Sequence, residues 1–108
     1  MIVKSEAVGA LVGREAELRK LERALLSAAK GEHGPAEADL REAIAAFDGM
    51  RMPIESSKAR YHLAGVLMKL GKPEEARTEL AIAIAAFQKT GSKLWLKRCR
   101  EALARFAG

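Results

Sequence analysis

The sequence predicts an all-α fold, in which antiparallel helical hairpins stack as a short solenoid of about five helices that ends in a capping helix. The first supporting observation is composition: the 108 residues include 21 alanines and 13 leucines, but only 11 valines, isoleucines and threonines together. Alanine and leucine lose little conformational freedom in a helix, whereas β-branched side chains lose more. The second observation is an internal repeat, and the third is the placement of proline and glycine around apolar stripes.

The repeat matches residues 31–47 to residues 71–87 at an offset of 40, without a gap. The identical pairs are Gly31 and Gly71, Ala36 and Ala76, Leu40 and Leu80, Ala43 and Ala83, Ile44 and Ile84, Ala45 and Ala85, Ala46 and Ala86, and Phe47 and Phe87. The sequence therefore uses one helical unit twice, and a chain of this length has room for one domain built from two such units.

The repeat sets the expected boundaries. We expect a tail or irregular lead-in over residues 1–12, followed by a single helical domain over 13–108. Within that domain, the first unit spans residues 13–50, the second unit spans 53–90, and the capping helix spans 92–106.

The first unit begins with a helix over 14–30, and its second helix follows Pro35, since the first turn of a helix tolerates a missing N–H. The apolar residues of the second helix recur at the i, i+3, i+4, i+7 spacing of one helix face: Leu40, Ala43, Ile44 and Phe47. Gly49 is expected to stop this helix. The leucines of the first helices match better at an offset of 42, which predicts a first turn, 31–34, two residues longer than the second, 71–72.

The second unit follows the same plan. Pro53 opens a helix that runs to Leu70, and Pro73 opens the next helix, which Gly91 is expected to stop. The apolar stripe of the second helix is Leu80, Ala83, Ile84 and Phe87. Ser92 is a suitable N-cap for the capping helix. Its inner face is expected to carry Trp95, Cys99, Ala102 and Phe106, helped by Leu96 and Leu103.

The string ARYHLAGVLMKLGKPEEARTELAIAIAAF, over residues 59–87, resembles a tetratricopeptide repeat. The small and large residues typical of that family stand at matching positions: Leu63, Ala64, Leu67, Gly71, Ala76, Leu80 and Ala83. The chain departs from the family pattern at Arg60, where a tryptophan is preferred, and at Gln88, where a proline is preferred. Its period of 40 residues is also longer than the family's roughly 34.

The longer period is similar to that of repeats in large ATP-dependent bacterial regulators of the MalT/LuxR type, in which a segment similar to residues 71–106 often closes the repeat array. This resemblance implies a non-enzymatic module for protein–protein interaction or scaffolding, acting in bacterial regulation. Its partner would be a protein or a peptide.

The resemblance also implies where a partner would bind, because the first helix of each pair lines the concave side of such stacks. The residues expected to face this groove are Lys58, Tyr61, Gly65, Met68 and Lys69. A tyrosine and a methionine flanked by lysines suit a peptide that has apolar anchors and acidic groups. The alternative is that Tyr61 and Met68 pack against the first helix pair or across a self-association surface.

The net charge of +5 is confined to the last twenty residues, since residues 1–88 contain 13 basic and 13 acidic side chains. The basic surface of the capping helix is predicted to consist of Lys93, Lys97, Arg98, Arg100 and Arg105. Three interpretations stay open: a solvated outer face, a site for an acidic peptide or protein, and a nucleic-acid contact that would make the chain a nucleic-acid-associated regulator.

A solenoid of two units leaves an end uncovered, because each unit buries its apolar face on the next. We therefore expect the first helix to meet another molecule, most simply a second copy in a two-fold dimer. The residues expected to self-associate are Leu11, Val12, Leu18, Leu21 and Leu25. The alternative is that the chain is a fragment whose further repeats cover this end.

The sequence shows no group of residues that would carry catalysis or hold a metal or a cofactor. His33 and His62 have no cysteine or carboxylate at ligand spacing, and adjacent Glu74 and Glu75 do not share a helix face. We therefore predict no enzyme activity, no metal and no cofactor. The single cysteine, Cys99, forms no internal disulfide, and no apolar stretch is long enough to cross a membrane, so we expect a cytoplasmic location.

Overall fold

The structure is a computed structural model that describes the backbone of residues 2–107 and the side chains of residues 15–106. The described chain is helical and contains no strand, which confirms the predicted all-α fold. The helices, in chain order, are α1 (Ile2–Ala29), α2 (His33–Gly49), α3 (Pro53–Lys69), α4 (Pro73–Thr90) and α5 (Lys93–Ala107).

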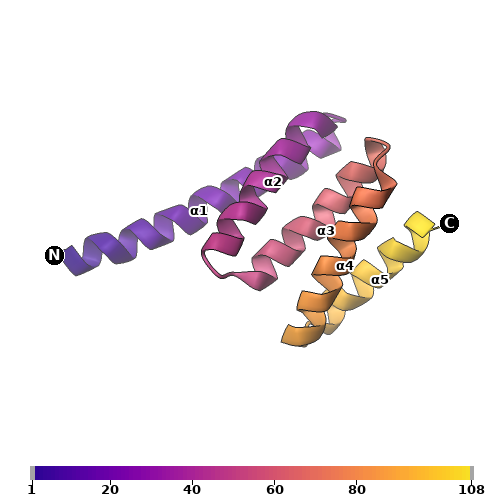
Figure 1. Cartoon of the computed structure of the whole chain (residues 1–108). Coiled ribbons are helices and arrows are strands. Elements are labelled where there is room, and N and C mark those ends of the chain that lie inside the picture. The colour runs from indigo at the N-terminus through magenta and orange to yellow at the C-terminus, as the bar shows by residue number, and fades with distance from the viewer. Residues whose placement is uncertain (1, 108) are drawn as a thin grey trace.

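Each helix packs against the next one in the chain, as Figure 1 shows for the run from α1 to α5. Contacts also join the backbones of α1 and α3 and those of α3 and α5, whereas the backbones of α2 and α4 lie farther apart and meet through side chains, as in the ion pair of Arg41 with Glu75 at 3.8 Å. The odd-numbered helices are therefore closer together than the even-numbered ones. It follows that the stack curves, with α1, α3 and α5 on its concave side and with α2 and α4 on its convex side.

The start of α1 corrects one expectation. We expected residues 1–12 to be a tail or irregular lead-in, but the helix begins at Ile2. No proline stands between Ile2 and Pro35, so no residue removes a backbone donor from the helix, and glycine weakens a helix without breaking it. Of the predicted self-association residues, Leu11 and Val12 lie outside the side chains that the structure describes.

The turns between helices all close with the same pair of hydrogen bonds. In the first turn, the N–H of Glu32 donates to the carbonyl of Ser27 at 2.8 Å, and the N–H of Gly31 donates to that of Ala28 at 3.0 Å. This is the Schellman arrangement, which needs one residue in the left-handed backbone conformation. That residue has a φ between 55° and 86° in every turn: Gly31, Arg51, Gly71 and Gly91.

The equal turns correct two expectations. Gly49 does not stop α2 but is its last residue, and Arg51 takes the left-handed position instead. The two hairpin turns also have the same length, so the predicted two-residue difference is wrong. The reason is that α2 begins at His33, with Pro35 as its third residue, where an N–H would still lack an intrahelical partner. The offset of 40 therefore holds from α1 through α5.

The core runs as one cluster through all five helices. Alanines occupy the points where helices approach each other, and Leu40, Leu63, Leu67, Leu80 and Phe87 fill the space beside them. The predicted stripes of α2 and α4 are buried, apart from Ile84, which is half-buried. Ala24 of α1 and Ala64 of α3 are both fully buried, which agrees with their offset of 40.

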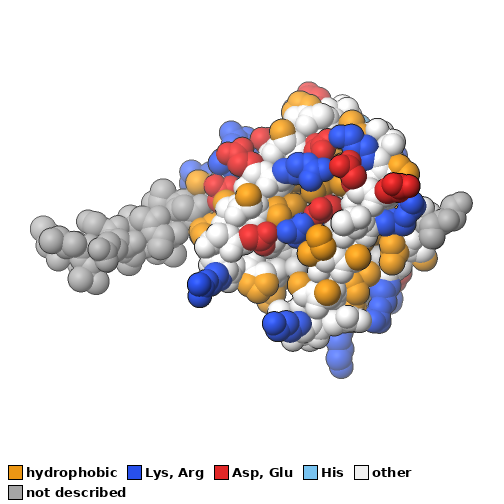
Figure 2. Space-filling model, in the orientation of Figure 1, with side chains coloured by type: hydrophobic (Ala, Val, Ile, Leu, Met, Phe, Trp, Pro, Cys, Tyr) orange, Lys and Arg blue, Asp and Glu red, His pale blue; other side chains and the backbone are white. Residues whose placement is uncertain are grey.

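Arg60 explains how the fold does without the tryptophan that the family prefers at its position. Its Nη1 lies 2.5 Å from Oε1 of Glu79 in α4, and its Nη2 lies 3.0 Å from Oδ2 of Asp48 in α2. Ser56 also donates a hydrogen bond to Asp48. These side chains tie three helices together with charge, and Figure 2 shows acidic and basic side chains close to one another on the face in view.

Candidate functional site

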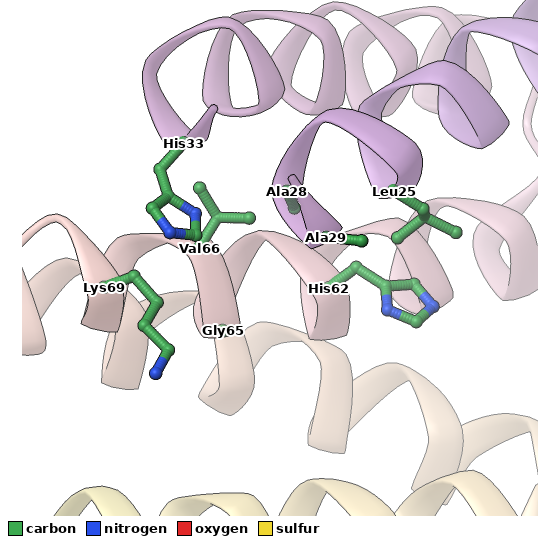
Figure 3. A pocket seen from close by; sticks show the side chains of 8 residues that line it. All are labelled: Leu25, Ala28, Ala29, His33, His62, Gly65, Val66 and Lys69. Atoms are coloured by element: carbon green, nitrogen blue, oxygen red, sulfur yellow. The ribbon is translucent and has the colours of Figure 1, made fainter. Parts of the chain in front are cut away.

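A hollow of about 390 Å³ opens between α1 and α3, the first two helices of the concave layer (Figure 3). Its lining residues are Leu25, Ala28 and Ala29 from α1, His33 from the start of α2, and His62, Gly65, Val66 and Lys69 from α3. Most of this lining is apolar, with the polar groups at its edge, which is the usual composition of a binding pocket.

Gly65 lies in the middle of this hollow. A Cβ atom built at this position would meet no other atom within 4 Å, and the φ angle of Gly65 is not positive. Neither packing within the chain nor backbone conformation therefore requires a glycine here. A glycine inside a helix costs about 1 kcal/mol of stability relative to alanine. The one visible effect of Gly65 is to keep the hollow open.

Two histidines border the hollow in different surroundings. The Nδ1 atom of His33 is buried and has no hydrogen-bond partner among the described residues, and Figure 3 shows the ring reaching from α2 toward α3. Burial lowers the pKa of His62, and the positive charge of Arg98 lowers it further, so this imidazole is neutral near pH 7. The exposed Lys69 then supplies the positive charge at the rim of the hollow.

The predicted groove residues fall into two groups. Gly65 and Lys69 line the hollow. Lys58 and Tyr61 instead contact Trp95 of α5: the Nζ atom of Lys58 lies 5.4 Å from the indole centroid, and the Tyr61 ring meets it edge-on at 5.5 Å. Met68 is half-buried and packs against the core cluster. The groove therefore has an open part beside α1 and a filled part beside α5.

Trp95 is the centre of the filled part. Its ring stacks on Phe87 of α4 at 5.9 Å and meets His62 edge-on at 6.2 Å. The guanidinium carbon of Arg98 lies 5.0 Å from the same ring, so that two cations approach one indole. Contacts of a cation with the face of tryptophan are favourable, and the contact with Lys58 joins α3 to α5, while the stacking of Phe87 joins α4 to the same ring.

The equal turns also show how the character of the concave layer changes along the stack. Residues 40 apart occupy equivalent places on α1, α3 and α5, so two rows of three residues cross this layer. The first row is Leu18, Lys58 and Arg98, and the second row is Leu25, Gly65 and Arg105. The concave surface is thus apolar at α1 and cationic at α5.

A comparison with known protein families matches residues 27–99 to the tetratricopeptide repeat. The chain belongs to the tetratricopeptide repeat family. The match covers the second predicted unit and the first one from residue 27 onward, from the end of α1 into α5, and so extends beyond the string that carried the resemblance. Comparisons with curated proteins and with solved structures find no match.

The basic residues of α5 are all on the surface of this repeat protein: Lys93, Lys97, Arg98, Arg100 and Arg105 are exposed. One ion pair is seen among them, in which Nζ of Lys97 lies 3.9 Å from Oε1 of Glu101 on the same helix. Among residues 15–106, no acidic side chain pairs with the other four basic residues. The charge that distinguishes this end of the sequence is therefore largely uncompensated.

The described leucines of the predicted self-association surface are spread over different surroundings. Leu21 packs against the core of the repeat stack, Leu25 lines the hollow, and Leu18 is half-buried. Among the leucines of α1 whose side chains are described, Leu26 is the most exposed, with 62% of its surface accessible. An offset of 40 instead of 42 would have placed Leu25 beside Gly65 and assigned it to the groove.

Sequence reasoning also missed Ala28, Ala29, His33, His62 and Val66 as lining residues of the hollow.

No helix of the described residues is long and apolar enough to cross a membrane. In the same part of the chain, no three histidine, cysteine or acidic side chains gather as metal ligands would. Cys99 is fully buried, and burial raises the pKa of its thiol to about 11, so this side chain is a protonated core residue.

Proposed function

We propose that this tetratricopeptide repeat protein is an interaction module that binds a segment of a partner protein on its concave face. Tetratricopeptide repeats are typically non-catalytic modules for protein–protein interaction. The observation that carries the proposal is Gly65, a destabilising residue in the middle of a helix that no neighbour requires and that keeps a hollow open. We propose no enzyme activity and no cofactor for this module.

The chemistry of the concave face indicates the kind of segment that it binds. One apolar side chain of the partner enters the hollow between Leu25 and Val66, where burial of a leucine or phenylalanine contributes about 1.5–3 kcal/mol. A polar group beside this anchor reaches the exposed amine of Lys69 at the rim of the hollow. Acidic residues lie toward α5, over Lys58 and Arg98.

The test is to select peptides from a displayed library of short random sequences on the full chain, and to measure the affinity of the best ones by fluorescence anisotropy. We expect the selected peptides to share one apolar anchor and nearby acidic residues. Gly65→Leu fills the hollow and is expected to weaken binding by about tenfold or more, which corresponds to roughly 1.4 kcal/mol. The matched control is Ala85→Leu, on the exposed face of α4. Equal affinities of the two variants would contradict the proposal.

A second function is suggested by the five exposed basic residues of α5, which would suit a nucleic-acid-associated regulator. In that case binding to duplex DNA weakens steeply with added salt, and reversal of the charges at Lys97, Arg98 and Arg100 abolishes it. If retention on a DNA resin is the same for wild type and for the reversed variant, this function is excluded.

We further propose that the chain acts in bacterial regulation in the cytoplasm, as its similarity to the MalT/LuxR type of regulator suggests, and that it forms a two-fold dimer through α1. The exposed Leu26 supports such a contact. Light scattering on wild type and on Leu26→Glu tests the dimer. A monomeric wild type at micromolar concentration contradicts it.

A further inference from the structure

α5 follows the turn before it in the same register as α3 follows the turn before it. The N–H of Met52 donates to the carbonyl of Phe47, and the N–H of Ser92 donates to that of Phe87, which fixes the offset of 40 between these helices. The first helical hydrogen bond after each turn shows the same offset, because Ser56 bonds to Met52 as Leu96 bonds to Ser92. Each residue of α5 can therefore be compared with its equivalent in α3.

This comparison identifies a stripe that is covered in α3 and open in α5. In α3 its residues are Ser57, Arg60, Tyr61 and Ala64, all of them buried or half-buried. The equivalent residues of α5 are Lys97, Arg100, Glu101 and Ala104, all of them exposed. The buried positions agree with the offset of 40 as well, since Ala59 and its equivalent Cys99 are both fully buried. The open stripe of α5 thus matches a face on which α3 carries other helices.

Arg60 and Arg100 differ in their partners. Arg60 pairs with Glu79 of α4, at 2.5 Å, whereas no acidic side chain among residues 15–106 pairs with Arg100. Residues 89–108 contain six basic side chains and one acidic side chain. A helix that packs here must therefore bring carboxylates, and a second copy of α5 would bring mainly like charges. Leu96 and Leu103, one helical turn to either side of Arg100, are half-buried and supply apolar contact.

We propose that the open stripe of α5 binds an acidic amphipathic helix of a partner protein, which packs on α5 as α4 packs on α3. A carboxylate of that helix pairs with Arg100, as Glu79 pairs with Arg60. Its small side chains lie over Ala104, whose equivalent Ala64 is fully buried. This surface is distinct from the hollow around Gly65, and the two sites can be tested independently.

The probe for this test is a fluorescently labelled synthetic peptide with the sequence of α4, residues 73–90, held helical by a side-chain cross-link. It carries Glu79, the residue that pairs with Arg60 within the chain. Its binding to the full chain is measured by anisotropy. We expect saturable binding, a loss of about tenfold or more with Arg100→Glu, and recovery when the same variant meets a peptide that carries Glu79→Arg.

The matched control is Lys93→Glu, which makes the same change of charge on α5 at a position whose α3 equivalent, Pro53, is itself exposed. We expect its affinity to stay within about twofold of wild type. Circular dichroism verifies that both variants stay folded. Failure of the wild type to bind the peptide, equal losses in both variants, or no recovery with the reversed peptide would each overturn the proposal. So would binding of duplex DNA in place of the peptide.

Discussion

Arg51 adopts the same left-handed backbone conformation as Gly91, with φ angles of 55° and 73°, in turns that have the same hydrogen bonds. A residue with a Cβ atom is strained in that conformation by about 1–2 kcal/mol, and a glycine is not. The turn between α2 and α3 is therefore the one inter-helix turn of the described chain that forms against the backbone preference of its residue.

Arg51→Gly is accordingly expected to stabilise the protein. Relief of the strain exceeds the added flexibility of the unfolded chain, and we expect a net gain of roughly 0.5–1 kcal/mol in urea denaturation. Arg51→Ala is the control, because it keeps the Cβ atom and the strain while removing the long side chain. A gain of the same size with alanine would show that the left-handed conformation is not the cause.

Gly65→Ala is expected to raise the stability of the protein and to weaken peptide binding. The new Cβ atom meets no neighbour, so the helix gains about 1 kcal/mol and the melting temperature rises by about 4 °C. The same methyl group intrudes on the hollow, so affinity for a selected peptide is expected to fall. Calorimetry and anisotropy measure the two effects on one sample. A variant that is more stable and binds equally well would show that the hollow is not the binding site.

The ion pair between Arg60 and Glu79 is expected to be strongly coupled, because the two side chains are only 17% and 13% exposed. A double-mutant cycle with Arg60→Ala and Glu79→Ala should give a coupling energy of about 1–3 kcal/mol in urea denaturation. The pair of Lys97 and Glu101, whose side chains are 76% and 58% exposed, is the matched control and should give about 0.5 kcal/mol or less. Equal coupling energies for the two pairs would contradict the conclusion that Arg60 holds the helices together through its ion pairs.

The stability of the protein is expected to decrease as the pH falls below about 6.5. Burial and Arg98 hold the pKa of His62 below its ordinary value of 6.5, so the unfolded chain takes up this proton first and is favoured by acid. Urea denaturation at a series of pH values measures the effect. His62→Phe should flatten this part of the profile. Arg98→Gln should bring the pKa of His62 in the folded protein closer to its ordinary value, and so reduce the loss of stability. A profile that neither variant changes would contradict the assignment to His62.

A second loss of stability is expected at lower pH, from Glu37. The hydrogen bond from Arg41 and then that from Lys72 hold the pKa of this carboxyl below its ordinary value of 4.5. The stability that these pairs contribute is present above that value and is lost as the pH falls through the lowered pKa. Glu37→Gln should remove this step from the profile and leave the His62 step in place.

The helices, their order and most of their buried residues were predictable, because local patterns specify them. The stripe from Leu40 to Phe47 and its copy from Leu80 to Phe87 are regular enough to define one helix face each. The length of the first turn was predicted wrongly, because matching of leucines was given more weight than the register carried by Gly31 and Gly71. That error also moved Leu25 away from the groove residue beside which it lies.

The sequence by itself determined which segments are helical, that two units repeat, and that the positive charge belongs to the last helix. These properties depend on composition and on spacing along the chain. The tertiary structure decided that Gly65 faces an open hollow while Met68 packs on the core, and that Arg60 meets Glu79 while Arg100 meets no acid among the described side chains. Such properties depend on which helix covers which face, and two equivalent residues differ there because one has a neighbouring helix and the other does not.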